Sequence, residues 1–180
     1  RIDEIDLNEI ADLAGIQATG GFSAAESYAW HRELLATRAN DYDPRVATRI
    51  RRGATMMAHE YIDLLQARQR WIRSMEQALQ GYDAVLSPTV PILAPLLANV
   101  APATGTDPAA DTARDEAFFR ANALLLRNTS VVNMLDGCAL SLPCHQAGEL
   151  PVGLMVWHAA LRDDAVLNIG LLIEQELQKQ

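Results

Sequence analysis

Two short runs of the sequence combine residue types that can do chemistry. His59 and Asp63 are four residues apart, so on a helix they share one face, as two ligands of a metal ion can. Cys144 precedes His145 directly, and a thiol beside an imidazole can act as a nucleophile. Neither pattern is complete, because His59 has no evident third ligand and adjacent residues of an extended chain point to opposite sides. We therefore expect a solvated helix face at the first run, an inert thiol at the second, and no metal or cofactor.

The cysteines point in the same direction. Cys138 and Cys144 are six residues apart, which matches neither a redox CxxC pair nor a zinc-binding spacing. Free cysteine usually behaves as a small apolar residue, so we expect both thiols to be buried or half-buried. Two reduced thiols also favour a cytoplasmic protein over a secreted one.

Charge narrows the class of partner and of catalyst. The formal net charge of -8 argues against nucleic acid as a partner, and the absence of a long uncharged apolar run argues against a membrane partner. Lys179 is the only lysine among the 15 basic residues. The other 14 basic residues are arginines, which keep their proton at neutral pH.

The first part of the chain must position its residues on helices. Apolar residues recur at spacings of three and four from Met57 to about residue 80, which predicts a long amphipathic helix. Ser23 with Glu26 forms a capping-box pattern, and Asp43 precedes a proline suited to the first helical position. Helices are therefore expected over residues 3–14, 23–38, 44–54 and 57–80.

The second part alternates strands with helices. Short apolar runs predict strands over 84–86, 139–142 and 152–157, and helices are expected over 115–127 and from Asp163 or Asp164 to about 177. Between residues 87 and 112 the prolines predict an ordered loop, whose leucines should pack against a surface. Helices followed by interleaved strands and helices indicate an α/β protein with a helical segment (1–81) and a strand–helix segment (82–180).

Several motifs resemble one known family. The runs YDAVLSPTVPILAP, NTSVVNMLDGCALSLPC and GELPVGLMVW occur in the order found in the C-terminal third of the amidase signature family, and YDPRVATRIRRG is similar to the segment that precedes them. Each motif alone is modest, but four in order are specific. The run Asp136-Gly137-Cys138-Ala139 and the residue His145 resemble the biuret- and allophanate-type hydrolases of small amides.

The resemblance carries expectations for fold, function and site. It implies that residues 1–180 are the C-terminal portion of a single amidase domain, contributing to a mixed sheet flanked by helices. The whole enzyme would hydrolyse the C–N bond of a small amide. Thr89, Thr129 and Asn133 fall where the family lines its cleft, which makes them candidate substrate-binding residues. Thr129 and Asn133 have a second interpretation, since both could cap the end of the preceding helix.

The catalytic residues of the family are missing. The resemblance implies a serine nucleophile, a second serine in a Gly/Ser-rich segment and a lysine base, and the sequence has neither such a segment nor an internal lysine. We therefore expect no catalytic residue here and no activity from the chain alone. The alternative is a non-catalytic binding or structural module. Open sheet edges would also favour a homodimer.

Overall fold

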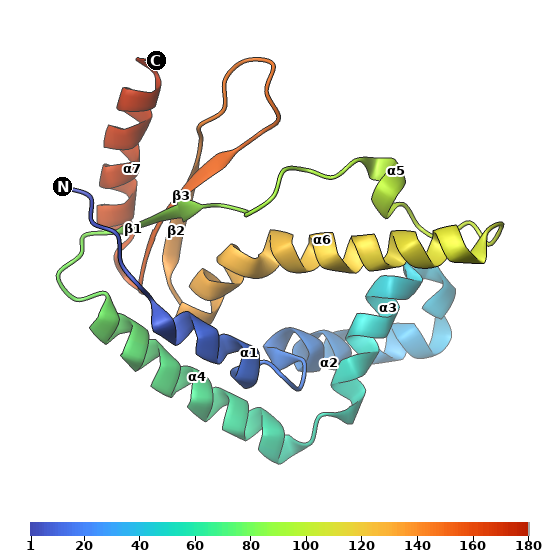
Figure 1. The fold of residues 1–180 in the computed structure, drawn as a ribbon. Helices are drawn as coiled ribbons and strands as arrows, with labels where there is room; N and C mark the ends of the chain where they lie inside the picture. The colour runs from blue at the N-terminus through green and yellow to red at the C-terminus, as the bar shows by residue number, and fades with distance from the viewer. Residues whose placement is uncertain (180) are drawn as a thin grey trace. The chain divides into compact units, whose positions relative to one another are not determined.

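The computed structural model describes residues 1–179, and the chain divides into two compact units. The first unit comprises Arg1–Ala78 and the second begins at Leu79. Figure 1 shows helices only in the first of these ranges and a small sheet with helices in the second. The α/β class and the helix-rich first half predicted from the sequence are confirmed.

The first unit is built from four α-helices joined by short 3₁₀ turns. Their bounds are η1 (Asn8–Ala11), α1 (Asp12–Ile16), α2 (Gly21–Thr37), η2 (Ala39–Asp41), α3 (Pro44–Arg51), η3 (Arg52–Thr55) and α4 (Ala58–Ala78). The helix expected over residues 3–14 begins only at residue 8, and residues 3–7 adopt no regular structure.

The start of α3 matches its sequence signal. The Asp43 carboxylate accepts a hydrogen bond from the backbone N–H of Arg45 at 2.8 Å, and Pro44 occupies the first helical position. The Arg45 guanidinium also pairs with this carboxylate at 2.8 Å. The bond from the Arg45 side chain is the main reason that the pKa of Asp43 is lowered to about 2.

The start of α2 differs from its sequence signal. Ser23 lies inside the helix and is not its cap, since α2 begins at Gly21 after Gly20, whose φ of +109° only glycine adopts easily. The carboxylate of Glu26 accepts a hydrogen bond from the Tyr61 hydroxyl at 2.9 Å instead of completing a capping box. Gly20 and Gly21, which both have positive φ, therefore place the start of α2 before Ser23.

The apolar stripe of α4 supplies much of the core of this unit. Met75 is fully buried, and Trp71 is 3% exposed with its indole N–H donating to the Glu9 carbonyl at 2.6 Å. Met57 and Leu65, two of the apolar residues that recur at this spacing, are exposed. A second cluster, formed by Leu35, Ala47 and Ile50, joins α2 to α3.

The second unit contains a three-stranded sheet and three helices. Their bounds are β1 (Val85–Pro88), α5 (Leu97–Val100), α6 (Pro108–Leu135), β2 (Cys138–Pro143), β3 (Gly153–His158) and α7 (Asp163–Leu177). The strand order is β1-β3-β2, and β3 pairs antiparallel with both neighbours. Leu142, Val156 and Val166 form a core in which α7 packs on the sheet, as Figure 1 shows.

The long helix α6 begins seven residues before the predicted position 115. Asp107 caps it by accepting hydrogen bonds from the N–H groups of Ala109 and Ala110, each at 3.1 Å, and Pro108 fills the first helical position. This is the same Asp-Pro signal that starts α3. The sequence does not reveal this helix start, because the prolines predict a loop over the whole stretch of residues 87–112.

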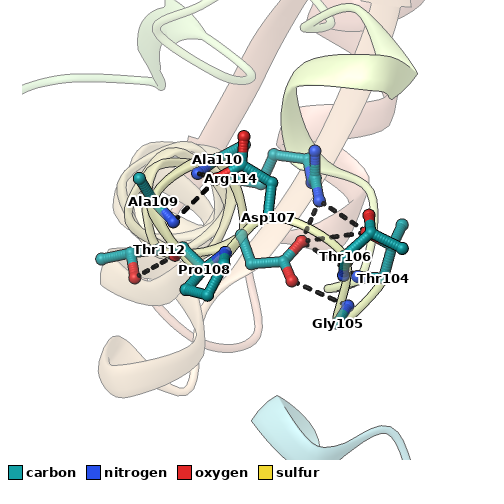
Figure 2. A network of polar contacts seen from close by, with 10 residues as sticks. Thr104, Gly105, Thr106, Asp107, Pro108, Ala109, Ala110, Thr112 and Arg114 are labelled. Atoms are coloured by element: carbon teal, nitrogen blue, oxygen red, sulfur yellow. Dashed lines mark hydrogen bonds and ion pairs between the residues drawn. The ribbon is translucent and has the colours of Figure 1, made fainter.

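A carboxylate inside the first turn of α6 fastens the preceding loop, and Figure 2 shows Thr104, Gly105 and Arg114 in the network around it. Asp111 accepts hydrogen bonds from the N–H groups of Thr104 at 2.9 Å and Gly105 at 2.8 Å, and it pairs with Arg114. The bond from the Thr104 backbone is the main reason that the pKa of Asp111 is lowered. This cluster of Thr104, Gly105, Asp111 and Arg114 is called the Asp111 clamp below.

Other sequence expectations fail at exposed positions. Leu93 and Leu96 of the loop and Leu97 at the start of α5 are 52%, 73% and 80% exposed, so they do not pack as predicted. Asp163 and Asp164 lie in the first turn of α7, which has no side-chain cap. Within residues 1–179, no helix is both long and apolar enough to cross a membrane.

Candidate functional site

Two hydroxyl groups meet at one end of the sheet. Thr89 follows β1 directly, Ser141 lies in β2, and their side-chain oxygens are 2.5 Å apart. Thr89 is half-buried and Ser141 is exposed. Hydroxyl groups both donate and accept hydrogen bonds, so this pair has capacity left for another polar group.

The central strand makes this meeting possible because it has a glycine between the two hydroxyls. The N–H of Thr89 donates to the carbonyl of Gly153 at 2.8 Å, and Pro143 pairs with Gly153 on the other side. A Cβ atom on Gly153 would lie 2.6 Å from the Ser141 hydroxyl and 2.7 Å from that of Thr89. Only glycine leaves room for the two side chains to cross β3.

The end of β1 is also fastened to α6. The side-chain amide of Asn128 donates to the carbonyl of Pro88 at 2.7 Å. In the sequence, Asn128 is marked only by an Asn-Thr-Ser run suited to glycosylation or local capping. No sequence signal marks a contact across 40 residues, so this role was missed.

The other two predicted site residues lie on the last turns of α6. The Thr129 hydroxyl donates to the Leu126 carbonyl of its own helix at 3.3 Å, and Asn133 is exposed one turn further on. Backbone groups close the helix, because the N–H of Asp136 donates to the Asn133 carbonyl at 3.3 Å and that of Gly137 to Val132 at 3.0 Å. Thr129 therefore does not cap α6, and Asn133 contributes its backbone carbonyl to the cap.

The structure thus brings only one predicted site residue to the hydroxyl pair. Thr89 joins Ser141, which lies within a family motif but was not predicted as a site residue. Thr129 follows Asn128, the residue that binds the carbonyl preceding Thr89. Thr129 and Asn133 share a face of α6 by their spacing.

Cys144 and His145 each bond to backbone instead of to each other. The Cys144 thiol donates to the Val152 carbonyl at 3.5 Å, and Nδ1 of His145 lies 3.4 Å from both the nitrogen and the oxygen of Val152. Cys144 is exposed, so its predicted burial is wrong, whereas Cys138 is half-buried as expected. The connection between β2 and β3, residues 144–152, leads the chain back so that Val152 lies beside Cys144, and it leaves the thiol at the surface.

The remaining candidate ligands and bases are solvated. His59 and Asp63 are exposed, as predicted for the polar face of α4. No three His, Cys, Asp or Glu side chains gather in a metal-binding arrangement within the described residues. Lys179 is 65% exposed and pairs with Glu176 at 2.5 Å. Lys179 therefore lies in solvent and not in an enclosed site.

Comparison with known proteins gives the family. The Amidase family model matches residues 5–167, most of the chain, and the chain therefore belongs to that family. The amidase resemblance seen in the sequence motifs is confirmed.

Its relatives differ in what they act on. The chain is 29% identical over 156 residues to a 2-amino-5-chloromuconic acid deaminase of Comamonas testosteroni, covering 86% of this chain and 31% of the relative. It is 27% identical over 164 residues to one polypeptide of the glutamyl-tRNA(Gln) amidotransferase of Saccharolobus solfataricus, covering 88% and 31%. The chain thus spans about a third of the length of these relatives.

A solved structure shares the fold. An allophanate hydrolase of Kluyveromyces lactis superposes with a TM-score of 0.75 at 24% identity, covering 94% of this chain and 26% of the other. At this identity the likeness concerns the fold alone. The sequence and the fold together therefore identify the chain as a segment of an amidase that spans part of the length of its homologues.

Proposed function

We propose that this chain is the C-terminal portion of an amidase domain that hydrolyses the C–N bond of a small amide to a carboxylate and ammonia. The carrying observation is the amidase match over residues 5–167 in a chain whose only lysine is exposed and ion-paired. The nucleophile and base of the reaction come, on this proposal, from residues outside these 180 or from another chain.

On this proposal, the residues outside this chain carry out the bond-breaking chemistry, and the 180 residues of the chain contribute substrate binding. A nucleophile adds to the amide carbon, the C–N bond breaks with proton transfer to the leaving nitrogen, and water then releases the carboxylate. Lys179, the only lysine of the chain, is exposed and ion-paired, so it is not placed for that proton transfer. Their contribution is to bind and orient the substrate, which can account for a large part of a rate enhancement.

The hydroxyl pair is the part of the chain best suited to substrate contact. Thr89 and Ser141 can donate to an amide carbonyl and accept from an amide N–H, and the missing Cβ of Gly153 lets their hydroxyls meet over β3. Thr129 and Asn133 belong to the same proposal as residues near the cleft wall. Their support is the family motif and their common face on α6.

The finer parts of the proposal concern substrate and setting. The Asp136–Ala139 run and His145 favour a small amide of the biuret or allophanate type over a transfer RNA substrate. A cytoplasmic setting rests on the two free thiols. A homodimer would cover the exposed leucines of α7, namely Leu167, Leu171 and Leu172. No membrane or nucleic-acid partner is proposed.

Ammonia release by the purified chain tests the catalytic part. We expect no turnover of biuret, allophanate or simple amides above the buffer background. Turnover that survives Lys179→Ala would contradict the proposal, and its further loss in Cys144→Ser would assign the activity to the thiol. A chain that is inactive alone but restores hydrolysis when combined with the rest of an amidase domain would support it over a non-catalytic module.

The site residues are tested in an active enzyme that contains these 180 residues. We expect Thr89→Val and Asn133→Ala to lower kcat/KM for the amide while the melting temperature changes little. Asn122→Ala, at a half-buried position of the same helix, is the matched control and should leave hydrolysis unchanged. Equal rates for the three variants would remove Thr89 and Asn133 from the site.

A further inference from the structure

A cavity in the first unit is separate from the residues discussed above. It lies between α2 and α3 with the adjoining η3, and its volume is about 250 Å³. Gly20, Ser23 and Ser27 line it from α2 and its start, and Arg49 and Arg52 line it from α3 and η3. That volume suits a small molecule of a few heavy atoms and exceeds what a single water fills.

The space between the two helices is left by the small side chains on α2, which face larger apolar side chains on α3. Ser23 and Ser27 are four residues apart, one turn of α2, so both project toward the same side. Across from them, Val46 and the buried Ile50 form an apolar wall on α3. Close packing of the two helices beside the cavity is set by Gly53, where a Cβ would lie 2.0 Å from the Ala24 carbonyl oxygen. The helices cannot slide together to close the space without a backbone clash.

The charge that lines the cavity is positive and comes from Arg49 and Arg52, which are both exposed to solvent. Arg38 pairs with Asp41, and Arg45 pairs with Asp43. Arg49 and Arg52, by contrast, have no ion pair within the described residues. In a chain with a formal net charge of -8, two such cations at one cavity are a local reversal of the overall charge. Each presents a fork of N–H donors suited to the oxygens of a carboxylate or phosphate.

Hydrogen-bond donors on the α2 side add to this preference. The Ser27 hydroxyl is turned onto the Ala24 carbonyl at 3.3 Å, a long bond, whereas no partner engages the Ser23 hydroxyl among residues 1–179. No side chain caps the start of α2, so the first N–H groups of this helix also lack a side-chain acceptor. The cavity therefore combines two guanidinium groups, a hydroxyl and an apolar wall.

We propose that this cavity binds a small organic anion through a carboxylate or phosphate group. Arg49 and Arg52 contact the anionic oxygens, Ser23 donates its hydroxyl, and Val46 with Ile50 packs against the carbon portion. The site uses residues of the first unit only, so it does not depend on the proposed amidase function. Its ligand is distinguished from a neutral amide by the two positive charges.

Equilibrium dialysis and calorimetric titration of the 180-residue chain test the site, with inorganic phosphate and succinate as separate probes. Ionic strength is held constant with sodium chloride. We expect saturable binding of at least one probe with one site per chain, and at least tenfold weaker binding in Arg49→Gln and in Arg52→Gln. Binding of phosphate alone or of succinate alone would show which oxyanion the site prefers.

The control is Arg51→Gln, because Arg51 is an exposed arginine of the same helix that does not line the cavity. It should bind as the unaltered chain does. Ser23→Leu, a change at an exposed position that fills the cavity, should abolish binding while the circular dichroism spectrum is retained. Absence of binding for both probes, or an equal loss in Arg51→Gln, would overturn the proposal, since nonspecific attraction to the arginines would then explain the signal.

Discussion

At one end of β3 the backbone of Gly153 runs beneath two hydroxyl groups, and at the other end His158 is enclosed by backbone. The first end is partly open, with Ser141 exposed and Thr89 half-buried. The second end is closed, with His158 only 8% exposed. The hydroxyl pair beside the start of β3 can therefore still bind a ligand, whereas the side chain at the end of β3 makes all of its hydrogen bonds within the protein.

Both ring nitrogens of His158 are used. The N–H of Ala159 donates to Nδ1 at 2.8 Å, so this nitrogen carries no proton, and Nε2 then donates to the Tyr82 carbonyl at 3.3 Å. Burial is the main cause that lowers the pKa of His158, and the positive charge of Arg162 adds to it. The Tyr82 carbonyl and the Asp83 carboxylate act in the opposite direction. A neutral imidazole is the form that this environment fits.

The comparison separates structural polar groups from candidate functional ones. A buried side chain with both of its hydrogen bonds made stabilises the fold, and it has no capacity for a substrate. A hydroxyl pair at an accessible strand end has that capacity. Perturbing each end in the same way should therefore give different results.

The largest effect is expected for Gly137→Ala, at the closed end. A Cβ on Gly137 would lie 2.3 Å from the His158 carbonyl oxygen, and a backbone carbonyl in a sheet cannot rotate away. We expect a loss of about 3 kcal/mol in the free energy of unfolding, measured by urea denaturation. Gly15→Ala, where the added Cβ meets nothing within 4 Å, is the control and should not destabilise the chain.

The pH dependence of the closed end should come next. Because folding lowers the pKa of His158 below its ordinary 6.5, its contribution is complete above pH 6.5 and is lost as the pH falls from there toward the folded-state value. Thermal melts between pH 7.5 and 5 should show this slope, and His158→Gln should flatten it. His145→Gln, at an exposed histidine, serves as the control; an unchanged slope in His158→Gln would sink the assignment.

A smaller cost is expected for Gly153→Ala, at the open end. The added Cβ would lie closest to two side-chain hydroxyls, which can rotate aside where a carbonyl cannot, and it would also lie 3.2 Å from the Thr89 Cβ. We expect about 1 kcal/mol of destabilisation together with separation of the hydroxyls. Urea denaturation measures the first, and a crystal structure of the variant shows the second. A cost equal to that of Gly137→Ala would mean that the two ends are equally rigid.

The smallest effect on stability is expected for Ser141→Ala. Its hydroxyl is exposed and its loss leaves the Thr89 hydroxyl able to bind water, so the change should be within about 0.5 kcal/mol. In an amidase containing this segment, the same substitution should lower kcat/KM. A large drop in melting temperature with unchanged hydrolysis would assign the pair a structural role.

Local signals in the sequence predicted much of the fold. The Asp43-Pro44 start of α3 and the apolar spacing of α4 depend on interactions within a few residues, and both were predicted. The start of α6 carried the same Asp-Pro signal at Asp107-Pro108 but was hidden by the prolines around it. Ser23 shows the limit of a cap pattern, because the conformation of two preceding glycines decided where α2 begins.

The candidate sites depend on contacts between distant parts of the chain. Ser141 meets Thr89 across 52 residues, and this follows from strand register, which motif spacing does not give. The family motif selected Thr89 without its partner. The cavity beside Arg49 and Arg52 could not be foreseen either, because it requires the packing of α2 against α3.

The Asp111 clamp has a consequence for how the chain can be re-engineered. The segment between Thr89 and Thr104 is fastened at its start by the bond to Gly153 and at its end by Asp111. Its middle is exposed, including Leu96 and Leu97. Lengthening a loop whose ends are already held costs little entropy. A reporter peptide inserted after the exposed Leu93, ahead of α5, should thus be tolerated without disturbing either anchor.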